Sequence, residues 1–166
     1  MPESLLLIFI NFGKNSFMDL LPKLNIPYTQ PKLKTKNQEV FIFDPIRKKY
    51  VKLTPEEWVR QQFINYLIHF LNYPITHFAV EKKIKNYKSQ RPDIVIYNKN
   101  FQPAMLIECK APSVKIDDNV FKQIIAYATA ENFSYLIITN GIKTAICKIQ
   151  RNSCAFLKKI PNFTTL

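Results

Sequence analysis

Residues 91–110 read RPDIVIYNKNFQPAMLIECK, and this stretch decides the fold that the sequence predicts. It holds two runs rich in β-forming residues, about Asp93–Tyr97 and Ala104–Lys110, with polar residues and a proline between them. Short apolar runs bounded by turn-forming residues are typical of strands. The connection is too short for a crossover helix, so the two strands are expected to pair antiparallel.

Period-two alternation assigns the side chains of the second strand to opposite faces of the sheet. Glu108 and Lys110 fall on one face, and Ile107 and Cys109 fall on the other. Pairing with the strand that Asp93 opens then brings Asp93, Glu108 and Lys110 together. Acidic residues are scarce in this chain, so the placement of these two carboxylates is informative.

This trio of side chains suits phosphoryl chemistry. Carboxylate oxygens are the ligands that Mg²⁺ prefers, and bound Mg²⁺ polarises a phosphoryl oxygen and lowers the pKa of bound water. A neighbouring lysine can orient the attacking water and offset developing negative charge. Taken alone, each residue also has an ordinary interpretation: Glu108 and Lys110 as a solvated strand face, Asp93 as a turn residue, and Cys109 as a small core residue.

Two helices and further strands are predicted around this pair. Thr54 suits an N-cap, Pro55 the first helical position and Glu57 a capping box, so a helix is expected from there to about Asn72. A second helix is expected over Asp118–Glu131. The other predicted strands are Val40–Phe43, Tyr50–Leu53, His77–Ile84, Tyr135–Thr139, Ile142–Ile149 and Ala155–Lys159.

The order of these elements predicts an α/β fold. Val40–Phe43 and Tyr50–Leu53 form an N-terminal β-hairpin, and the rest forms a mixed β-sheet flanked by helices with an αβββαβ core. Asn140-Gly141 is a strong hairpin signal between two of the later strands. Residues 1–38, which include four prolines, are expected to be an irregular lead-in, and residues 39–166 one domain. Met18 is an alternative start, which would leave residues 1–17 as an upstream extension.

Composition narrows the range of functions. The 24 Lys and Arg residues against 12 Asp and Glu give a net charge of +12, which indicates either a nucleic-acid partner or the lysine bias of an A/T-rich genome. Two glycines are too few for a P-loop or a dinucleotide-binding loop. The three cysteines lack paired spacing, which argues against a zinc site and is typical of the reducing cytoplasm. No run is long enough to span a membrane, so a cytoplasmic protein with no membrane contact is expected.

The quoted stretch, continued as LIECKAP over 106–112, resembles the PD-(D/E)xK nuclease signature. More narrowly, residues 40–150 resemble the N-terminal nuclease domain of the type I restriction endonuclease motor (R) subunit. The supporting pieces are LTPEEWVRQ at 53–61, EKKI at 81–84, the Gln123-x-x-x-Tyr127 pair and TNG at 139–141. The helicase motor motifs of that family are absent from this sequence, so the resemblance implies a stand-alone domain with a restriction-endonuclease-like fold.

The resemblance implies a Mg²⁺-dependent enzyme that hydrolyses DNA phosphodiester bonds. Asp93, Glu108 and the backbone carbonyl of Cys109 would hold Mg²⁺, for which Mn²⁺ can substitute, and Lys110 would be the catalytic lysine. The alternative is a non-catalytic DNA-binding or complex-forming module that retains the nuclease fold.

An acidic residue on the first helix would complete the metal site. Glu56 is favoured because its spacing from the apolar positions turns it toward the sheet, whereas Glu57, the alternative, already serves the cap. The residues expected to contact DNA or support the catalytic lysine are Gln123, Tyr127, Arg91, Lys82, Lys83 and Lys85. The expected partners are DNA, subunits of a restriction or repair complex, and a second copy of the chain in a homodimer.

Overall fold

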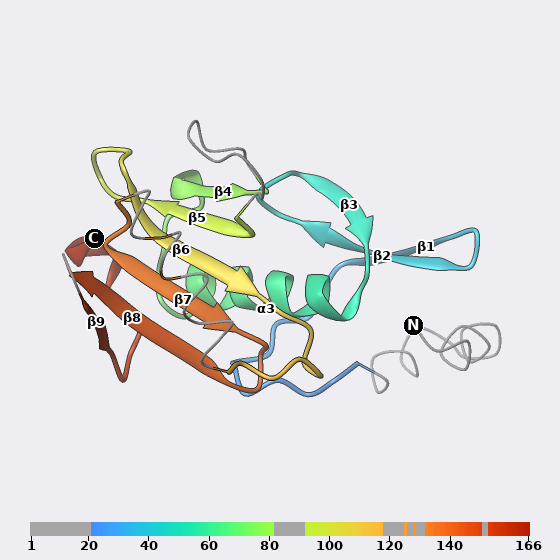
Figure 1. Cartoon of the computed structure of the whole chain (residues 1–166). Coiled ribbons are helices and arrows are strands. Elements are labelled where there is room, and N and C mark those ends of the chain that lie inside the picture. Colours follow the sequence, from blue (N-terminus) through green and yellow to red (C-terminus); the bar gives the residue numbers. More distant parts are fainter. Residues whose placement is uncertain (1–20, 82–91, 118–124, 126–127, 129–131, 151–152) are drawn as a thin grey trace.

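A computed structural model describes residues 21–81, 92–117, 125, 128, 132–150 and 153–166. Two sheets and one long helix, α3 (Pro55–His69), organise this part of the chain (Figure 1). The smaller sheet comprises β1 (Leu33–Lys36), β2 (Glu39–Asp44) and β3 (Lys49–Lys52). The larger sheet comprises β4 (Phe78–Val80), β5 (Ile94–Tyr97), β6 (Pro103–Cys109), β7 (Tyr135–Thr139), β8 (Thr144–Gln150) and β9 (Ser153–Phe156). Two 3-10 turns, η1 (Ile75–His77) and η2 (Phe163–Thr165), complete the described elements.

The six strands of the larger sheet lie in sequence order, from β4 at one edge to β9 at the other. Strands β4, β5 and β6 pair antiparallel, as predicted for three consecutive strands with no crossover helix between them. Strands β6 and β7 pair parallel, and β7, β8 and β9 are again antiparallel. The predicted mixed α/β fold is therefore confirmed, and it is consistent with the restriction-endonuclease-like class.

Helix α3 begins as the sequence predicts and ends earlier. The Glu57 backbone N–H donates to the Thr54 side chain at 3.0 Å, and Pro55 occupies the first turn. The helix ends at His69 rather than near Asn72, because Asn72 takes a φ of 56° and the Tyr73 N–H turns back to the Leu67 carbonyl. The chain therefore leaves the helix one turn sooner than proline placement alone predicts.

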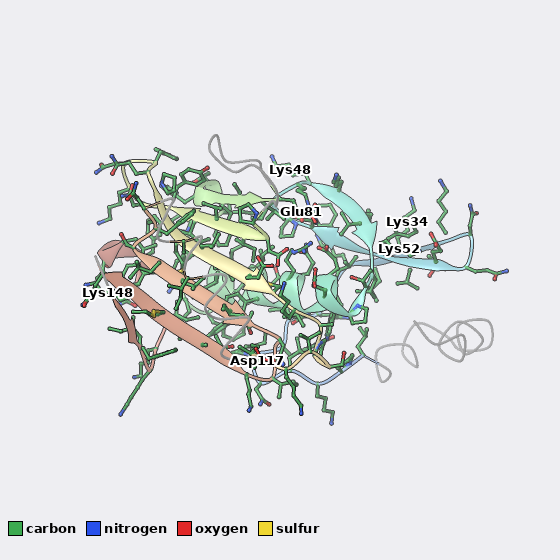
Figure 2. All side chains as sticks on the ribbon, in the orientation of Figure 1. Lys34, Lys48, Lys52, Glu81, Asp117 and Lys148 are labelled. Atoms are coloured by element: carbon green, nitrogen blue, oxygen red, sulfur yellow. A yellow bond between two sulfur atoms is a disulfide. The ribbon has the colours of Figure 1, made fainter. Side chains whose placement is uncertain are left out.

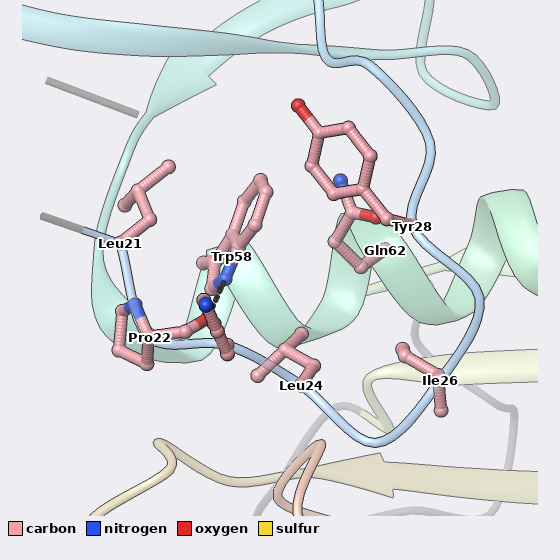
Figure 3. Close-up of a pocket in the computed structure, with 8 residues that line it drawn as sticks. Leu21, Pro22, Leu24, Ile26, Tyr28, Trp58 and Gln62 are labelled. Atoms are coloured by element: carbon pink, nitrogen blue, oxygen red, sulfur yellow. Dashed lines mark hydrogen bonds between the residues drawn. The ribbon is translucent and has the colours of Figure 1, made fainter. Parts of the chain in front are cut away.

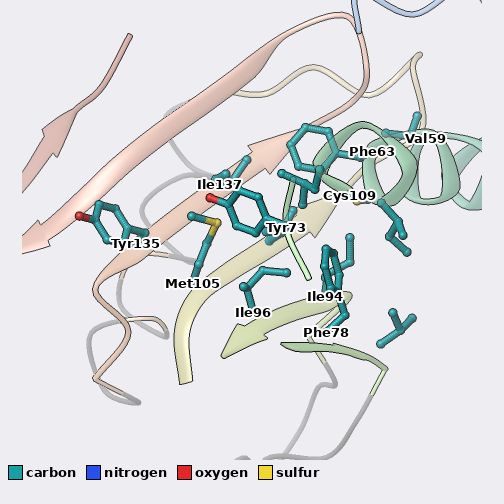
Figure 4. Close-up of a cluster of buried hydrophobic side chains, with 14 of the residues drawn as sticks. Val59, Phe63, Tyr73, Phe78, Ile94, Ile96, Met105, Cys109, Tyr135 and Ile137 are labelled. Carbon is teal, nitrogen blue, oxygen red and sulfur yellow. The ribbon is translucent and has the colours of Figure 1, made fainter. Parts of the chain in front are cut away.

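Apolar clusters cover both faces of the larger sheet. On one face, Val59 and Phe63 of α3 pack against Ile94 of β5, as Figure 4 shows. The opposite face carries a second buried cluster that includes Val95, Leu106, Leu136, Ile138 and Ala128. Ile125 and Ala128 are helical, and the rest of the helix predicted over 118–131 lies outside the described residues. The site strands β5 and β6 are thus fixed between two layers of apolar packing.

The predicted N-terminal hairpin is part of a larger sheet. Strand β1 lies within the segment predicted to be irregular and pairs antiparallel with β2, Leu33 opposite Ile42. Its alternating lysines carry little apolar signal, so the sequence did not reveal it. The inner face of this sheet buries Ile42 against Trp58 of α3. The Trp58 indole donates to the Pro22 carbonyl beside a cavity of about 420 Å³ (Figure 3).

Three strands differ from their predicted bounds by two residues or more, and β2, β3, β5 and β6 differ by one. Strand β4 ends at Val80, since Glu81 takes a φ of 49°, and residues 82–91 lie outside the described part of the chain. Strand β8 begins at Thr144 because residues 140–143 form a four-residue turn, and β9 lies two to three residues earlier than expected. Cys147 and Cys154 form a disulfide between β8 and β9, while Cys109 is a free, buried cysteine.

The turn between β7 and β8 holds the lead-in segment against the larger sheet. The Asn140 carboxamide oxygen accepts from the Ile142 and Lys143 N–H groups, at 2.9 and 2.7 Å. Gly141 takes a φ of 79°, a conformation that favours glycine. Its carbonyl accepts from the Asn25 N–H at 2.7 Å. The Asn-Gly pair therefore shapes the hairpin and also anchors residues from far along the chain.

We predict that Gly141→Ala destabilises the fold by about 1–3 kcal/mol, because a side chain at this φ is strained. An added Cβ would also meet the Leu24 Cδ2 atom at 2.6 Å. Urea unfolding of the variant measures the loss, with Lys143→Ala in the same turn as the control. Equal midpoints for Gly141→Ala and the native chain would contradict the prediction.

Candidate functional site

The two carboxylates of the quoted stretch meet at the junction of β5 and β6. Ile94 lies opposite Ile107, and continuing this register places Asp93 opposite Glu108. The Cys109 N–H donates to Asp93 Oδ2 at 2.7 Å, which fixes one carboxylate oxygen. Directly opposed residues of an antiparallel pair lie close together, and like charges there repel. The fold thus concentrates negative charge at this point.

Lys110 lies beside Glu108 on the same face, and its ammonium Nζ donates to Glu108 Oε1 at 2.8 Å. Burial raises the pKa of Glu108, and the charge of Asp93 raises it further. Burial would lower the pKa of Lys110, but the hydrogen bond and the charge of Glu108 outweigh it, so the Lys110 pKa is raised. Lys110 is therefore a cation at neutral pH, available as a donor beside two carboxylates.

Arg60 is the residue at this site that sequence reasoning missed. Its side chain is only 5% exposed, and its Nη2 donates to Asp93 Oδ1 at 2.5 Å. Its Nη1 pairs with Glu57 at 2.6 Å and with Glu81 at 3.0 Å. Burial lowers the pKa of Arg60, but the nearby carboxylates of Asp93 and Glu57 raise it by more, so the pKa is raised overall. The i,i+3 spacing from Glu57 was the available signal, although such pairs are common on helix surfaces.

A second arginine connects the smaller sheet to the same carboxylates. Arg47, in the turn between β2 and β3, pairs with Glu81 at 2.5 Å and Glu57 at 3.0 Å. Asp44 holds this turn by accepting from the Arg47 N–H and the Arg47 side chain. Figure 1 shows the smaller sheet beside the start of α3 and the ends of β5 and β6 that carry the site. The two sheets are thus joined through ion pairs as well as through apolar packing.

The two acidic residues of the first helical turn have different surroundings. The Glu57 carboxylate is 9% exposed and accepts from Arg47, Arg60 and the Gln61 amide. Glu56 is 43% exposed, and its ion pair with Arg60 is longer, at 3.4 Å. Burial raises the pKa of Glu56, and the nearby Asp93 charge adds to the increase. Glu56 therefore faces the same site as Asp93 and has the less engaged carboxylate.

Six predicted site residues lie outside the described residues: Arg91, Lys82, Lys83, Lys85, Gln123 and Tyr127. Within residues 21–81, 92–117, 125, 128, 132–150 and 153–166, no three His, Cys, Asp or Glu side chains converge closely enough to hold a metal ion as they stand. Asp93 and Glu108 instead pair with Arg60 and Lys110. The oxygen donors are of the type that Mg²⁺ prefers, so the chemistry of the donor set fits this ion.

The fold and this arrangement of carboxylates beside a lysine define a restriction-endonuclease-like α/β domain. The family model for the type I restriction enzyme R protein N terminus matches residues 55–161, more than half of the chain. The chain therefore belongs to this family, which places it among the nuclease-related domains of restriction enzymes. The match begins at the first residue of α3 and leaves out the three-stranded sheet.

The other comparisons give no further relatives. No curated protein and no solved structure matches the chain. Among the helical residues that the structure describes, there is no segment of the length and hydrophobicity that crossing a bilayer requires.

We predict that Arg60→Met lowers the free energy of unfolding by about 3–5 kcal/mol, since it leaves buried carboxylates without their partner. Urea unfolding measures the loss. Lys52→Met is the matched control, because the Lys52–Glu39 pair is exposed and such pairs contribute about 1 kcal/mol or less. If Arg60→Met and Lys52→Met lower the free energy of unfolding by similar amounts, the buried ion pairs of Arg60 contribute no more to stability than an exposed pair, and the prediction is wrong.

We also predict that Glu108→Gln is more stable than the native chain at pH 7. The pKa of Glu108 is raised in the folded state, so folding disfavours its charged form. The protonated form of Glu108 stabilises the folded state relative to the charged form. This stabilisation is fully present below the ordinary carboxyl pKa and is lost as the pH rises through the raised pKa of the folded state. The difference in melting temperature between variant and native chain should therefore shrink as the pH falls toward 4. A stability difference that is the same at pH 4 and pH 7 would contradict this cause.

Proposed function

We propose that the domain is a divalent-cation-dependent nuclease that hydrolyses DNA phosphodiester bonds. The observation that carries this proposal is the opposed pair Asp93 and Glu108, with Lys110 hydrogen-bonded to Glu108. Membership of the type I restriction enzyme R protein N-terminal family supports DNA as the substrate. A carboxylate pair that could bind a metal ion, with a lysine beside it, is suited to metal-assisted phosphodiester hydrolysis.

In this proposal, Asp93, Glu108 and the Cys109 backbone carbonyl would hold Mg²⁺, or Mn²⁺ in its place. Glu56 completes the set in preference to Glu57, because its carboxylate is more exposed and less tightly paired. Bound Mg²⁺ supplies charge to polarise the phosphate and to lower the pKa of a bound water. Arg60 and the Cys109 N–H hold the Asp93 carboxylate in a fixed orientation by hydrogen bonding to its two oxygens.

Lys110 acts as a cationic donor. Its raised pKa keeps it protonated at neutral pH in the arrangement described above. It donates hydrogen bonds that orient this water and offset the negative charge that develops on the phosphate. Glu108 fixes the Lys110 ammonium through the 2.8 Å hydrogen bond.

A DNA-binding or complex-forming module without catalysis is the second candidate. The observation that favours it is the ion pairing of both carboxylates, Asp93 with Arg60 and Glu108 with Lys110. Such pairing satisfies the buried charges without an ion. A cleavage assay distinguishes the two candidate functions, because a nuclease cleaves DNA when a divalent cation is present and a binding module does not.

We predict that the native chain nicks plasmid DNA in the presence of Mg²⁺ or Mn²⁺ and that Lys110→Ala lowers the rate by at least about a hundredfold. Agarose gels of supercoiled plasmid measure the conversion, and EDTA should abolish it. Lys99→Ala, at an exposed position in the β5–β6 connection, is the matched lysine control.

If Lys110→Ala cleaves DNA at the native rate, Lys110 and its neighbouring carboxylates are not the catalytic site. DNA binding without cleavage under any of these conditions would favour the non-catalytic module. A contaminating nuclease is excluded if Lys99→Ala cleaves normally while Lys110→Ala, purified in the same way, does not.

A further inference from the structure

The outer face of the three-stranded sheet has an unusual composition. Its inner face is apolar and covers Trp58, as expected for a sheet that packs on a helix. Its outer face alternates lysines with aromatic rings instead of the mixed charges of an ordinary solvated surface. The members of this face are Lys32, Lys34, Lys36, Phe41, Phe43, Tyr50 and Lys52, with Glu39 as its acidic member. We refer to it as the lysine–aromatic face.

The register arranges these residues in rows across the sheet. In one row Phe43 lies opposite Tyr50, and the Lys32 ammonium lies 5.7 Å from the centre of the Phe43 ring. In the next row Phe41 lies between Lys34 and Lys52. The face therefore presents rings and ammonium groups side by side rather than in separate patches.

The aromatic rings form a connected platform. The Phe43 and Tyr50 rings meet edge to face with centroids 5.3 Å apart, and Lys34 lies 5.9 Å from the Tyr50 centroid. Tyr50 is 42% exposed, although a tyrosine of a folded domain usually buries most of its ring. Phe41 and Phe43 are half-buried, so Tyr50 is the exposed ring of this face. Aromatic rings with cations beside them are the features on which nucleic-acid bases stack.

The charge on this face is almost wholly positive. Lys32, Lys34 and Lys36 are all exposed and follow each other at alternate positions along the strand. Alternate residues of a strand lie about 6.6–6.8 Å apart, a spacing similar to that of neighbouring phosphates along one nucleic-acid strand. Glu39, the acidic member, pairs with Lys52 at 2.6 Å and so adds little negative potential.

The face extends away from the candidate site. Arg47, between β2 and β3, contacts Glu57 and Glu81, which both pair with Arg60 at the site. Figure 2 shows Lys48 next to Glu81, with Lys34 and Lys52 farther out on the same sheet. The sheet that carries these lysines is therefore joined through its β2–β3 turn to the ion pairs of the candidate site.

We propose that the lysine–aromatic face binds DNA, with the lysines on the phosphate backbone and Tyr50 and Phe43 stacking on exposed bases. The choice of DNA rests on the proposed function, whereas the charge and the rings point to a nucleic acid independently. The family match begins after this sheet, at residue 55, so the face is a feature of this chain beyond the matched domain. It adds binding area to the nuclease site and does not itself take part in the chemistry.

The test is DNA binding measured by fluorescence anisotropy in EDTA, where no cation-dependent cleavage occurs. The probe is a short fluorescein-labelled oligonucleotide, used as a single strand and as a duplex. Lys34→Gln combined with Lys36→Gln should weaken single-strand binding about tenfold and lower the salt slope of log K by about 1.4, since each phosphate contact contributes about 0.7. Tyr50→Ala should weaken single-strand binding without changing the salt slope, because stacking releases no counterions.

Lys99→Gln combined with Lys159→Gln is the charge-matched control, at exposed positions away from this sheet. The proposal is overturned if the control weakens binding as much as the Lys34 and Lys36 pair, or if the native chain does not bind DNA. It is also overturned if an RNA of the same sequence binds and the DNA does not. If the native chain cleaves DNA but the variants bind DNA as tightly as the native chain, the proposal for the lysine–aromatic face is wrong and the proposed nuclease function is unaffected. If the variants weaken DNA binding but the native chain does not cleave DNA, the proposal for the face is supported and the proposed nuclease function is not.

Discussion

The buried guanidinium of Arg60 is the interaction on which the site and its surroundings depend. It contacts carboxylates from the first turn of α3, from the end of β4 and from the start of β5. These elements are brought together by apolar packing, but packing alone would force their negative charges into a small, poorly hydrated volume. Arg60 offsets that repulsion at the centre, and Arg47 does so from the side of the smaller sheet.

The same charge balance bears on the proposed role of the carboxylates as cation ligands. A site made only of acidic residues would be unstable before its ion arrived, whereas one neutralised by arginine and lysine can fold first. Asp93 keeps a fixed orientation because both of its oxygens accept hydrogen bonds, and Glu56 remains the more accessible carboxylate. The contacts that stabilise the fold are thus the same ones that would hold the carboxylates in place for the proposed cation.

Much of this arrangement was accessible from the sequence because it follows from local rules. Strand alternation placed Glu108 and Lys110 on one face, and Thr54 with Pro55 marked the start of α3. The ion pairs of Arg60 with Asp93 and of Arg47 with Glu81 were not accessible, because their partners lie 33 and 34 residues away along the chain. Only the i,i+3 spacing of Arg60 from Glu57 was visible in the sequence. Strand β1 was missed for a different reason, since its pairing with β2 rather than any apolar pattern of its own makes it a strand.

The single parallel contact of the larger sheet, between β6 and β7, has a consequence for how the chain reaches its native state. Strands β4 to β6 and strands β7 to β9 pair antiparallel within their group, and the chain between strands is shorter within each group than between β6 and β7. Contacts between nearby residues close faster than contacts across a long connection. We expect the two groups to form as separate hairpin assemblies that join late, along the β6–β7 seam. Asp93 and Glu108 both belong to the first group, so we expect them to become neighbours before the sheet is complete.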